Sequence, residues 1–406
     1  MLSIDIVGLT GACSYALDCI EAELVNITNK HGKRVAYISV CMAEYWAIQG
    51  EALQDLAMCA LLHDNALTQY ISEELKKDSV IDLKKDLSEE KTNLHCIYGE
   101  KNITKLPFKT DVSNVILYHH EHADGTGPFQ KKWNEIPLFA RIIHLADIID
   151  IIRNSIDSDD NSWDFMCQYL SKNKDSLFDS ECVNAFLHVF TKESFMCLSD
   201  DSFETKLWEA IPREKLVFDW EMCKDVADFF AKIVDYKSSF TSRHSIGVAE
   251  KASMLAQYMG YDSIAVQKMY LAGALHDIGK MAVGNEILEK PDKLTDDEFS
   301  KMKNHAGYTY LILSEVNDFE EIRDWAAFHH EKLNGKGYPF GKTADELNEP
   351  ERIMACIDIY HALTEDRPYK KGLSHEKTCE MLDDMAQKGF VDSDISKKIR
   401  ECFGGI

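Results

Sequence analysis

Apolar residues recur along this chain every three or four positions, which is the spacing of one buried face of an α-helix. Two such segments follow His31 and His244, with apolar positions at Val35, Ile38, Met42 and Tyr45 and at Val248, Ala252, Leu255 and Met259. Two more precede His63 and His276, with apolar positions at Leu53, Leu56, Ala57 and Leu61 and at Val266, Met269, Tyr270 and Ala274. Strand-like alternation is hard to find. The chain is therefore predicted to be all-α.

Histidine and aspartate anchors occur twice along the chain in the same order, and each is repeated 210 to 213 residues later. The paired positions are His31 and His244, His63 and His276, Asp64 and Asp277, His95 and His305, His119 and His329, His120 and His330, and Asp147 and Asp358. We interpret the chain as a tandem duplication. The amphipathic segment 178–190 extends the first half, and the polar stretch 198–214 marks the junction. The predicted domains are residues 1–200 and 201–406.

The charge of the chain restricts its partners. Its 69 acidic and 45 basic residues give a formal net charge of -24. Such an acidic surface repels phosphates, so we expect no binding to DNA or RNA duplexes and no membrane insertion. We find no signal peptide and no apolar run of about 18 residues. The 12 cysteines are scattered without a C-x-x-C pair. These features predict a cytoplasmic protein whose cysteines are mostly buried as small apolar side chains.

The repeated anchors are candidate metal ligands. In the second half they are His244, His276, Asp277, His305, His329, His330 and Asp358. Neutral imidazole and carboxylate groups suit iron, manganese, zinc and related divalent ions. Five histidines and two aspartates are too many for one ion with an open position, but they fit two ions that share a bridging carboxylate. The second half is therefore predicted to hold a dinuclear centre.

Three segments of the second half resemble the HD-GYP family of HD-domain metal-dependent phosphohydrolases. They are HDIGK (276–280), HHEKLNGKGYP (329–339) and DIYHALTEDRPYK (358–370), and the resemblance covers about residues 220–406. It implies two tandem helical-bundle HD-type domains and hydrolysis of a cyclic dinucleotide, cyclic di-GMP above all, by attack of a metal-bridging hydroxide. By the same resemblance, Asp277 bridges the ions and Lys280 faces the bridging water and the phosphate. Both are candidate catalytic residues, and iron or manganese is the expected metal.

The substrate pocket is predicted from the same motifs and from nearby cationic residues. The candidate substrate-binding residues are Lys332, Asn334, Gly335, Lys336, Gly337, Tyr338, Pro339, Arg367 and Lys370. Two positions depart from the family pattern, since Lys332 replaces an arginine and Asn334 an aspartate, and the bidentate geometry of arginine is lost. Phe240 stands where trinuclear members of the family carry a glutamate, which favours two ions over three.

The first half keeps all its ligands but departs further from the family. His31, His63, Asp64, His95, His119, His120 and Asp147 form a candidate second metal site. However, Leu67 stands where the second half has Lys280, the segment HADGTGPF lacks the tyrosine of the GYP loop, and DRPYK has no counterpart. We expect a degenerate copy that stabilises, dimerises or regulates the protein, so a homodimer is one candidate assembly.

Two other function classes stay open. A non-catalytic sensor or scaffold would bind the nucleotide without hydrolysing it, although the surviving pocket motifs favour an enzyme. An HD-type di-iron oxygenase would use a similar ligand set to activate O₂, but it has no need of the GYP or DRPY segments. Consumption of O₂ by the iron-loaded protein would distinguish the oxygenase.

Overall fold

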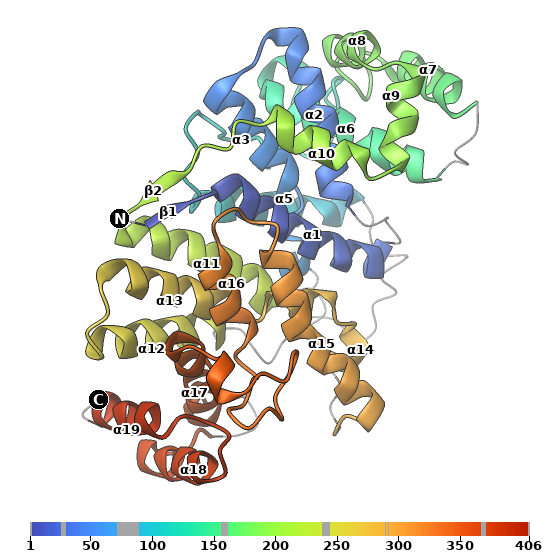
Figure 1. Ribbon diagram of the computed structural model, residues 1–406. Helices are drawn as coiled ribbons and strands as arrows, with labels where there is room; N and C mark the ends of the chain where they lie inside the picture. Colours follow the sequence, from blue (N-terminus) through green and yellow to red (C-terminus); the bar gives the residue numbers. More distant parts are fainter. Residues whose placement is uncertain are drawn as a thin grey trace. The chain divides into compact units, whose positions relative to one another are not determined.

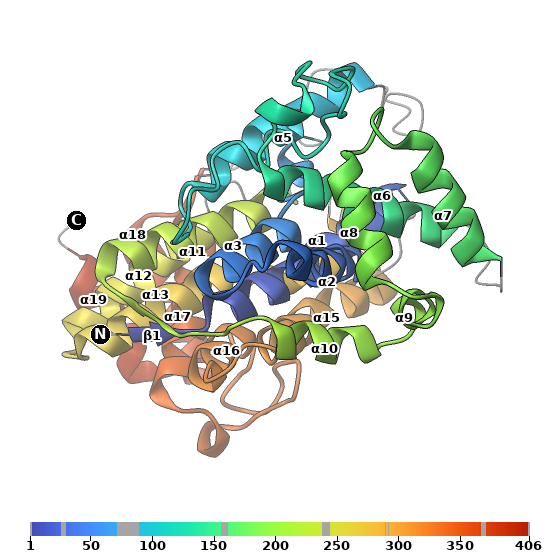
Figure 2. The same cartoon turned by 90° about the horizontal axis from the view of Figure 1, so that it is seen from above.

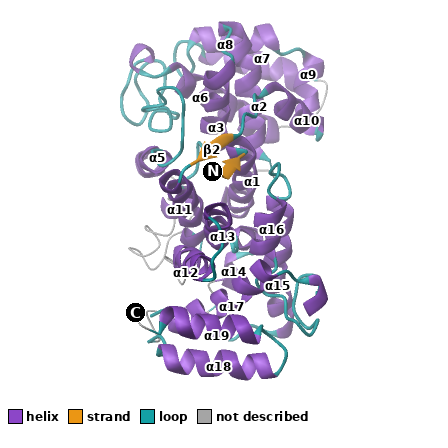
Figure 3. Ribbon diagram, turned by 60° about the vertical axis from the view of Figure 1, so that its left-hand side comes forward, coloured by secondary structure: helices purple, strands orange, loops and turns teal. Residues whose placement is uncertain are grey.

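Helices make up nearly all of the regular structure, which confirms the all-α prediction (Figures 1 and 3). The computed structural model describes residues 2–25, 30–70, 89–155, 161–237, 244–288, 290, 292–366 and 371–404. Across these residues, none of the helices combines the length and apolar character that a bilayer span requires. Three of the sequence-predicted positions, Phe240, Arg367 and Lys370, lie outside the described residues.

The chain divides into two compact units of similar size. The N-terminal unit comprises Ile6–Glu214, and the C-terminal unit comprises Met1–Asp5 together with Lys215–Ile406. Each unit is described by itself below.

The N-terminal unit is a bundle in which α2 contacts α3, α6, α8 and α10 (Figure 2). Its helices are α1 (Ile6–Val25), α2 (His31–Ala43), α3 (Gly50–Leu61), α5 (Glu89–Ile103), α6 (Leu138–Ser155), α7 (Ser162–Asn173), α8 (Ser180–Val189), α9 (Lys192–Met196) and α10 (Ser202–Ala210). The short 3₁₀ helices η1 (Glu44–Trp46), η2 (Trp133–Glu135) and η3 (Cys197–Ser199) connect them. Fully buried apolar side chains such as Ile38, Leu56 and Ile142 form its core.

The C-terminal unit packs α11, α12 and α13 side by side, with α17 against α12 (Figure 1). Its helices are α11 (Trp220–Tyr236), α12 (His244–Tyr258), α13 (Ser263–Leu275), α14 (Asn285–Leu288), α15 (Asp296–Leu313), α16 (Glu320–Ala327), α17 (Glu349–Thr364), α18 (His375–Gln387) and α19 (Ser393–Phe403), with η4 (Ile278–Ala282) and η5 (Ala344–Glu346) between them. Phe230, Leu255 and Ile357 lie in its core.

Four pairs of helices carry the repeated anchors at matching places. The helices α2 and α12 begin at His31 and His244, and α3 and α13 end just before the His–Asp pairs. The other two pairs are α5 with α15 and α6 with α17. The two units therefore use the same local framework to present the same residue types.

Capping residues in the sequence explain where two of these helices begin. Thr295 accepts a hydrogen bond from the backbone of Glu298 before α15, and Asn348 accepts one from Glu351 before α17. In both cases the glutamate carboxylate accepts a hydrogen bond from the backbone N–H of the capping residue, so backbone donors that the first helical turn leaves free are satisfied. These caps set the register that places His305 and Asp358.

The sequence showed no sign of one element, a two-stranded antiparallel ribbon. The strand β1 (Leu2–Ile4) pairs antiparallel with β2 (Leu216–Phe218), with Ile4 opposite Leu216. Each strand has three residues, too few to show an alternating pattern, and the two segments lie more than 200 residues apart in the sequence. The ribbon makes the first residues of the chain part of the C-terminal unit.

Candidate metal centres

The C-terminal unit brings together all seven predicted ligands, six of them in two groups of side chains and the seventh, Asp277, between the groups. Group A consists of His244, His276 and Asp358, and group B consists of His305, His329 and His330; within each group the ligand atoms all lie within 4.8 Å of one another. They come from the start of α12, the end of α13, the middle of α15, the turn after α16 and the middle of α17. Each group has the size of a coordination sphere around one ion.

Asp277 lies between the two groups. Its Oδ2 is 3.2 Å from His276 Nε2 of group A, and its Oδ1 is 3.5 Å from His305 Nε2 and 3.9 Å from His329 Nε2 of group B. One carboxylate thus offers one oxygen to each group, which is the arrangement of a ligand that bridges two ions.

Backbone carbonyls determine which ring nitrogen faces the site. The Nδ1 atoms of His276, His305 and His329 lie 2.7, 2.7 and 2.6 Å from the carbonyl oxygens of Gly273, Met302 and Ala326. Because a carbonyl only accepts, each Nδ1 carries the proton and donates. A neutral ring held in this way presents the lone pair of Nε2 to the site, which is the form that binds a metal ion.

The short distance between two ring nitrogens of group B shows whether a metal ion suits this group. His305 Nε2 and His329 Nε2 are only 3.3 Å apart. Burial lowers the pKa of His305 to about 3, and burial together with His330 lowers the pKa of His329, so both rings are neutral. Two lone pairs at this distance repel each other unless a cation lies between them. The donors of group B fit a divalent ion.

The two carboxylates are held in their charged form. Burial opposes ionisation of Asp277, but His276 and Lys280 hold its pKa well below its usual range. Burial likewise opposes ionisation of Asp358, and its hydrogen bond with His244 lowers its pKa. An ionised carboxylate is the form that ligates a metal.

The predicted ligands of the N-terminal unit form the same arrangement. Group A′ consists of His31, His63 and Asp147, and group B′ of His95, Cys96, His119 and His120, again with ligand atoms within 4.8 Å. Asp64 lies between them, with Oδ2 3.5 Å from His63 Nε2 and Oδ1 3.3 Å from His95 Nε2. The duplication therefore extends from the sequence to the geometry of the two centres.

Comparison with known proteins shows to which family the chain belongs. A family described as "HD domain" matches residues 18–182 and 228–395, which together make up most of the chain. The chain belongs to the HD-domain family. The two matched regions confirm the tandem HD-type organisation, and the resemblance to the HD-GYP phosphohydrolases is confirmed with it.

Two curated HD-GYP relatives and one solved structure extend the comparison. The 3'3'-cGAMP-specific phosphodiesterase 1 of Vibrio cholerae is 28% identical over 400 residues, which cover 94% of this chain and 88% of the relative. A cyclic di-GMP phosphodiesterase of Pseudomonas aeruginosa is 40% identical over 134 residues, 33% of this chain and 32% of the relative. A crystal structure of a cyclic GMP-AMP-specific phosphodiesterase of V. cholerae has the same fold, with a TM-score of 0.69 and 24% identity over 100% of this chain and 98% of that chain.

Lys280 of the HD motif contacts the carboxylate of Asp277. Its Nζ lies 2.5 Å from Asp277 Oδ2, and its side chain is partly exposed. The short helix η4 packs closely on α15 here, since a Cβ at Gly279 would come within 2.0 Å of the His305 carbonyl oxygen. Gly279 thus allows Lys280 and His305 to lie at the same centre. In the N-terminal unit, Ala66 stands at the position of Gly279 and Leu67 at the position of Lys280.

The GYP loop is tied down by Glu331. Its carboxylate accepts backbone hydrogen bonds from Phe340, Gly341 and Lys342 at 2.7 to 3.1 Å. Gly335 has φ of +74°, and a Cβ at Gly337 would come within 2.4 Å of Glu331 Cα, so both glycines are required by the backbone.

Tyr338 is the loop residue that reaches group B. Its ring centroid lies 4.7 Å from that of His330 and 6.3 Å from that of His305. Pro339 follows it and faces α15, where a Cβ at Gly307 would lie 3.7 Å from the proline Cβ. The loop therefore borders group B.

The other predicted substrate-binding residues have different surroundings. Lys332 places its ammonium 4.8 Å from the centroid of the Phe390 ring. Asn334 is exposed, and its side chain accepts a hydrogen bond from the backbone of Lys336, which is also exposed. None of these three contacts a ligand of group A or B through an interaction recorded among the described residues.

Sequence reasoning missed several residues that complete the centres. Asp150 Oδ2 lies 2.8 Å from His31 Nδ1, and Glu365 Oε2 lies 3.4 Å from His244 Nδ1. Cys96 joins group B′. Asp150 comes one helical turn after Asp147, and Cys96 directly follows His95, so the helical spacing could have pointed to both. Glu365 comes two turns after Asp358, at the end of α17, where spacing gives a weaker signal.

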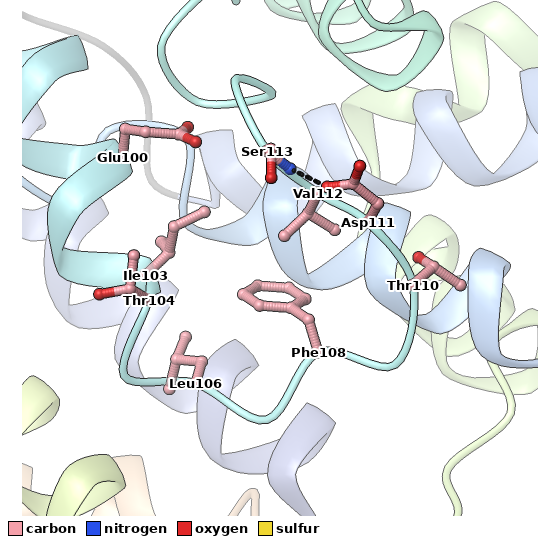
Figure 4. Close-up of a pocket in the computed structure, with 9 residues that line it drawn as sticks. All are labelled: Glu100, Ile103, Thr104, Leu106, Phe108, Thr110, Asp111, Val112 and Ser113. Atoms are coloured by element: carbon pink, nitrogen blue, oxygen red, sulfur yellow. Dashed lines mark hydrogen bonds between the residues drawn. The ribbon is translucent and has the colours of Figure 1, made fainter.

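A separate pocket of about 220 Å³ lies in the N-terminal unit (Figure 4). It is lined by Glu100, Ile103, Thr104, Leu106, Phe108, Thr110, Asp111, Val112 and Ser113. The carboxylate of Asp111 accepts a hydrogen bond from the backbone of Ser113 at 3.0 Å. No member of groups A′ or B′ lines it, so this pocket is not part of the metal centre.

Proposed function

We propose that the C-terminal unit is a metal-dependent phosphodiesterase that hydrolyses a cyclic dinucleotide, and that groups A and B with Asp277 are its catalytic centre. The observation that carries this proposal is the pair of ligand groups joined by one carboxylate, with neutral ring nitrogens turned toward each other. Two divalent ions bound there would neutralise a phosphodiester and acidify a water for in-line attack.

The residues of the chain divide the remaining work. Asp277 would hold both ions at a fixed separation through its two oxygens. Lys280, partly exposed beside Asp277, would direct its ammonium to the negative charge that develops on the phosphate. Tyr338 would form one wall of the nucleotide site next to His330. Arg367 and Lys370 are proposed substrate contacts from the sequence alone.

The substrate class follows from the relatives. The relative that aligns along nearly the whole chain acts, by its name, on 3'3'-cGAMP, and the Pseudomonas relative on cyclic di-GMP. Both compounds are cyclic dinucleotides that contain guanine. We propose that this chain hydrolyses one or both, with iron or manganese as the two ions.

The two halves are proposed to differ in role. Residues 201–406 would be the catalytic domain and residues 1–200 a degenerate domain that binds metal, with dimer formation as one further role. The twelve cysteines all lie within the described residues and none of them forms a disulfide bond, which supports the proposed cytoplasmic location.

A hydrolysis screen tests the proposal. The full chain, depleted of metal and reloaded with iron or manganese, is incubated with cyclic di-GMP, 3'3'-cGAMP and cyclic di-AMP, and the products are separated by chromatography. We expect turnover of a guanine-containing substrate and about two metal equivalents in the C-terminal centre. The variant Asp277→Ala is the matched control and should be inactive.

Three outcomes would contradict the proposal. Tight binding of a nucleotide without product would favour a sensor. Consumption of O₂ by the iron-loaded protein would favour an oxygenase. Equal turnover by Asp277→Ala would place the chemistry elsewhere.

A further inference from the structure

The N-terminal centre contains a thiol that the C-terminal centre lacks. Cys96 directly follows His95 on α5, and the equivalent residue after His305 on α15 is Ala306. Cys96 is fully buried. Groups B and B′ share three histidines at matching positions, so the sulfur is the chemical difference between them.

The sulfur lies at coordination distance from the rings. Cys96 Sγ is 3.5 Å from His95 Nε2, and all four ligand atoms of group B′ lie within 4.8 Å of one another. Zinc binds thiolate sulfur at about 2.3 Å and imidazole nitrogen at about 2.0–2.1 Å, so neighbouring ligands on a zinc tetrahedron lie about 3.5 Å apart. The separation of Cys96 and His95 matches that edge.

A second observation points to an ion at the same place. His119 is completely buried, and its Nδ1 lies 2.6 Å from the Ile116 carbonyl oxygen, to which it must donate. Its Nε2 faces group B′, where it makes no hydrogen bond of normal geometry among the described residues and lies 3.6 Å from Asp64 Oδ1. A buried ring nitrogen without a well-formed hydrogen bond costs free energy, and a cation bound within group B′ would satisfy it.

We propose that His95, Cys96, His119 and His120 bind a zinc ion through one thiolate and three imidazoles, an inference that rests on the proposed metal binding by the N-terminal unit. A thiolate is a soft ligand and favours zinc over the harder manganese and iron ions. Four protein ligands also complete a tetrahedron without Asp64, and a closed zinc site leaves no position for a reactive water. The N-terminal centre is then a structural zinc site.

This assignment separates the two halves by metal chemistry. Group B has three histidines and Ala306 in place of the thiol, so an ion bound there would have no sulfur ligand and would take its fourth protein ligand from Asp277. A single position next to a ligand histidine would then give one copy a sulfur ligand of its own, while the other copy depends on the carboxylate that lies between its two groups.

Cobalt absorption tests for the thiolate ligand. The full chain carrying His276→Ala and Asp277→Ala, which disable the C-terminal centre, is depleted of metal and titrated with Co²⁺. A cobalt–thiolate bond gives a charge-transfer band in the near ultraviolet. We expect this band in that background, its loss when Cys96→Ala or Cys96→Ser is added, and its retention with Cys379→Ala. Cys379 is the matched control because its sulfur also lies near a histidine, 3.7 Å from His375 Nε2.

Zinc affinity provides the second measurement. Competition with a chelator should show at least about tenfold weaker zinc binding in Cys96→Ala than in Cys379→Ala, because a direct ligand contributes at least as much as the outer partners whose loss costs 10- to 100-fold. An unchanged band or unchanged zinc affinity in Cys96→Ala would overturn the proposal. A band that is lost in Cys379→Ala instead would also overturn it.

The failure of this inference and of the proposed function can be told apart. If Co²⁺ binds to the N-terminal unit without a thiolate band while the wild-type protein hydrolyses its substrate, only the zinc–thiolate site is wrong. If the band depends on Cys96 but no cyclic dinucleotide is hydrolysed, only the proposed activity is wrong.

Discussion

Asp150 and Glu365 meet the same chemical requirement from different positions in the chain. The first histidine of each unit presents Nε2 to an aspartate of its ligand group and needs an acceptor for Nδ1. In the N-terminal unit Asp150 provides it, beside Arg34. In the C-terminal unit, His361 stands at the position of Asp150 and Gly247 at the position of Arg34. The carboxylate beside His244 Nδ1 is instead that of Glu365, one turn after His361 at the end of α17.

The residue types at positions 247 and 361 depend on each other for steric reasons. A Cβ at Gly247 would come within 2.3 Å of the His361 ring, so the imidazole occupies the space that a side chain at position 247 would need. Burial lowers the pKa of His361 to about 3, so this ring is neutral and cannot replace the ion pair of Asp150 with Arg34. The carboxylate beside Nδ1 of His244 therefore comes from Glu365, while Asp358 lies beside Nε2.

We predict that Glu365 is a positioning residue for the C-terminal centre. Burial by itself lowers the pKa of His244, but the nearby carboxylates of Asp358 and Glu365 raise it to about 9, so Glu365 increases the basicity of the ring. Glu365→Gln should weaken metal binding at group A by about 10- to 100-fold, as loss of such partners does elsewhere. Chelator competition measures this, with the exposed Glu401→Gln as control; equal affinities in the two variants would contradict the role.

Lys280 is predicted to act on the rate and not on metal content. Its ammonium is 2.5 Å from Asp277 Oδ2 and partly exposed, so it can reach a phosphate bound at the ions. Lys280→Ala should lower kcat by about 10- to 1000-fold, the range for a lost electrostatic donor. Steady-state kinetics with elemental analysis of the same samples measures both quantities.

The control for Lys280 is another lysine of the same unit. Lys301 lies exposed on α15, paired with Asp297, and Lys301→Ala should leave both kcat and metal content unchanged. Wild-type turnover in Lys280→Ala would remove Lys280 from the mechanism.

At the scale of elements, the ribbon of β1 and β2 decides which unit the start of the chain stabilises. Leu2 and Ile4 are buried, and β1 also contacts α13. A fragment of residues 201–406, the predicted C-terminal domain, lacks β1 and leaves β2 without its partner strand. A C-terminal fragment prepared for metal analysis should therefore retain residues 1–5, joined to the remainder by a linker.

We predict that Ile4→Ala destabilises the C-terminal unit although it lies at the opposite end of the sequence. Ile4 is 2% exposed, and truncation of a buried isoleucine costs about 2–5 kcal/mol. Val217→Ala on the paired strand is the control, since Val217 is 54% exposed and its truncation should cost less than about 0.5 kcal/mol. Amide hydrogen exchange should become faster in α11 and α13 of the Ile4→Ala variant. Faster exchange confined to α2 and α3 would contradict the assignment.

At the scale of the whole molecule, the two centres are alike in ligands and different in their surroundings. Both place an aspartate between two ligand groups, but only the C-terminal one has Lys280 and Tyr338 beside it. Metal alone can activate water, whereas a cyclic dinucleotide must also be positioned, and misplacement by about 1 Å can cost about 100-fold in rate. The two centres should therefore contribute unequally to turnover.

We predict that paired substitutions separate the two centres. His276→Ala with Asp277→Ala should abolish hydrolysis, and His63→Ala with Asp64→Ala should leave most of it. The melting temperature must be measured with the rate, because a metal in the N-terminal unit would also stabilise the protein that it binds. Equal losses of activity at unchanged melting temperature would show that both centres turn over or act as one.

The sequence by itself determined the helical class and the duplication, and it predicted seven candidate ligand positions in each half. Helical periodicity is a local property, and the HD, HH and D anchors are visible as residue types at fixed spacing. The motifs of the sequence also pointed to the glycines and the tyrosine of the GYP loop as candidate substrate-binding residues. None of these inferences needs contacts between distant parts of the chain.

Only the tertiary structure decided how those residues are combined. That Asp277 turns one oxygen to each ligand group, that Glu365 and not His361 supports His244, that Cys96 joins the rings of His95 and His119, and that β1 belongs with β2 all depend on segments that meet after folding. Periodicity states which face of a helix is buried but not which atoms of other helices it meets. The candidate ligands can therefore be identified from the sequence, whereas their arrangement into groups depends on how the helices pack.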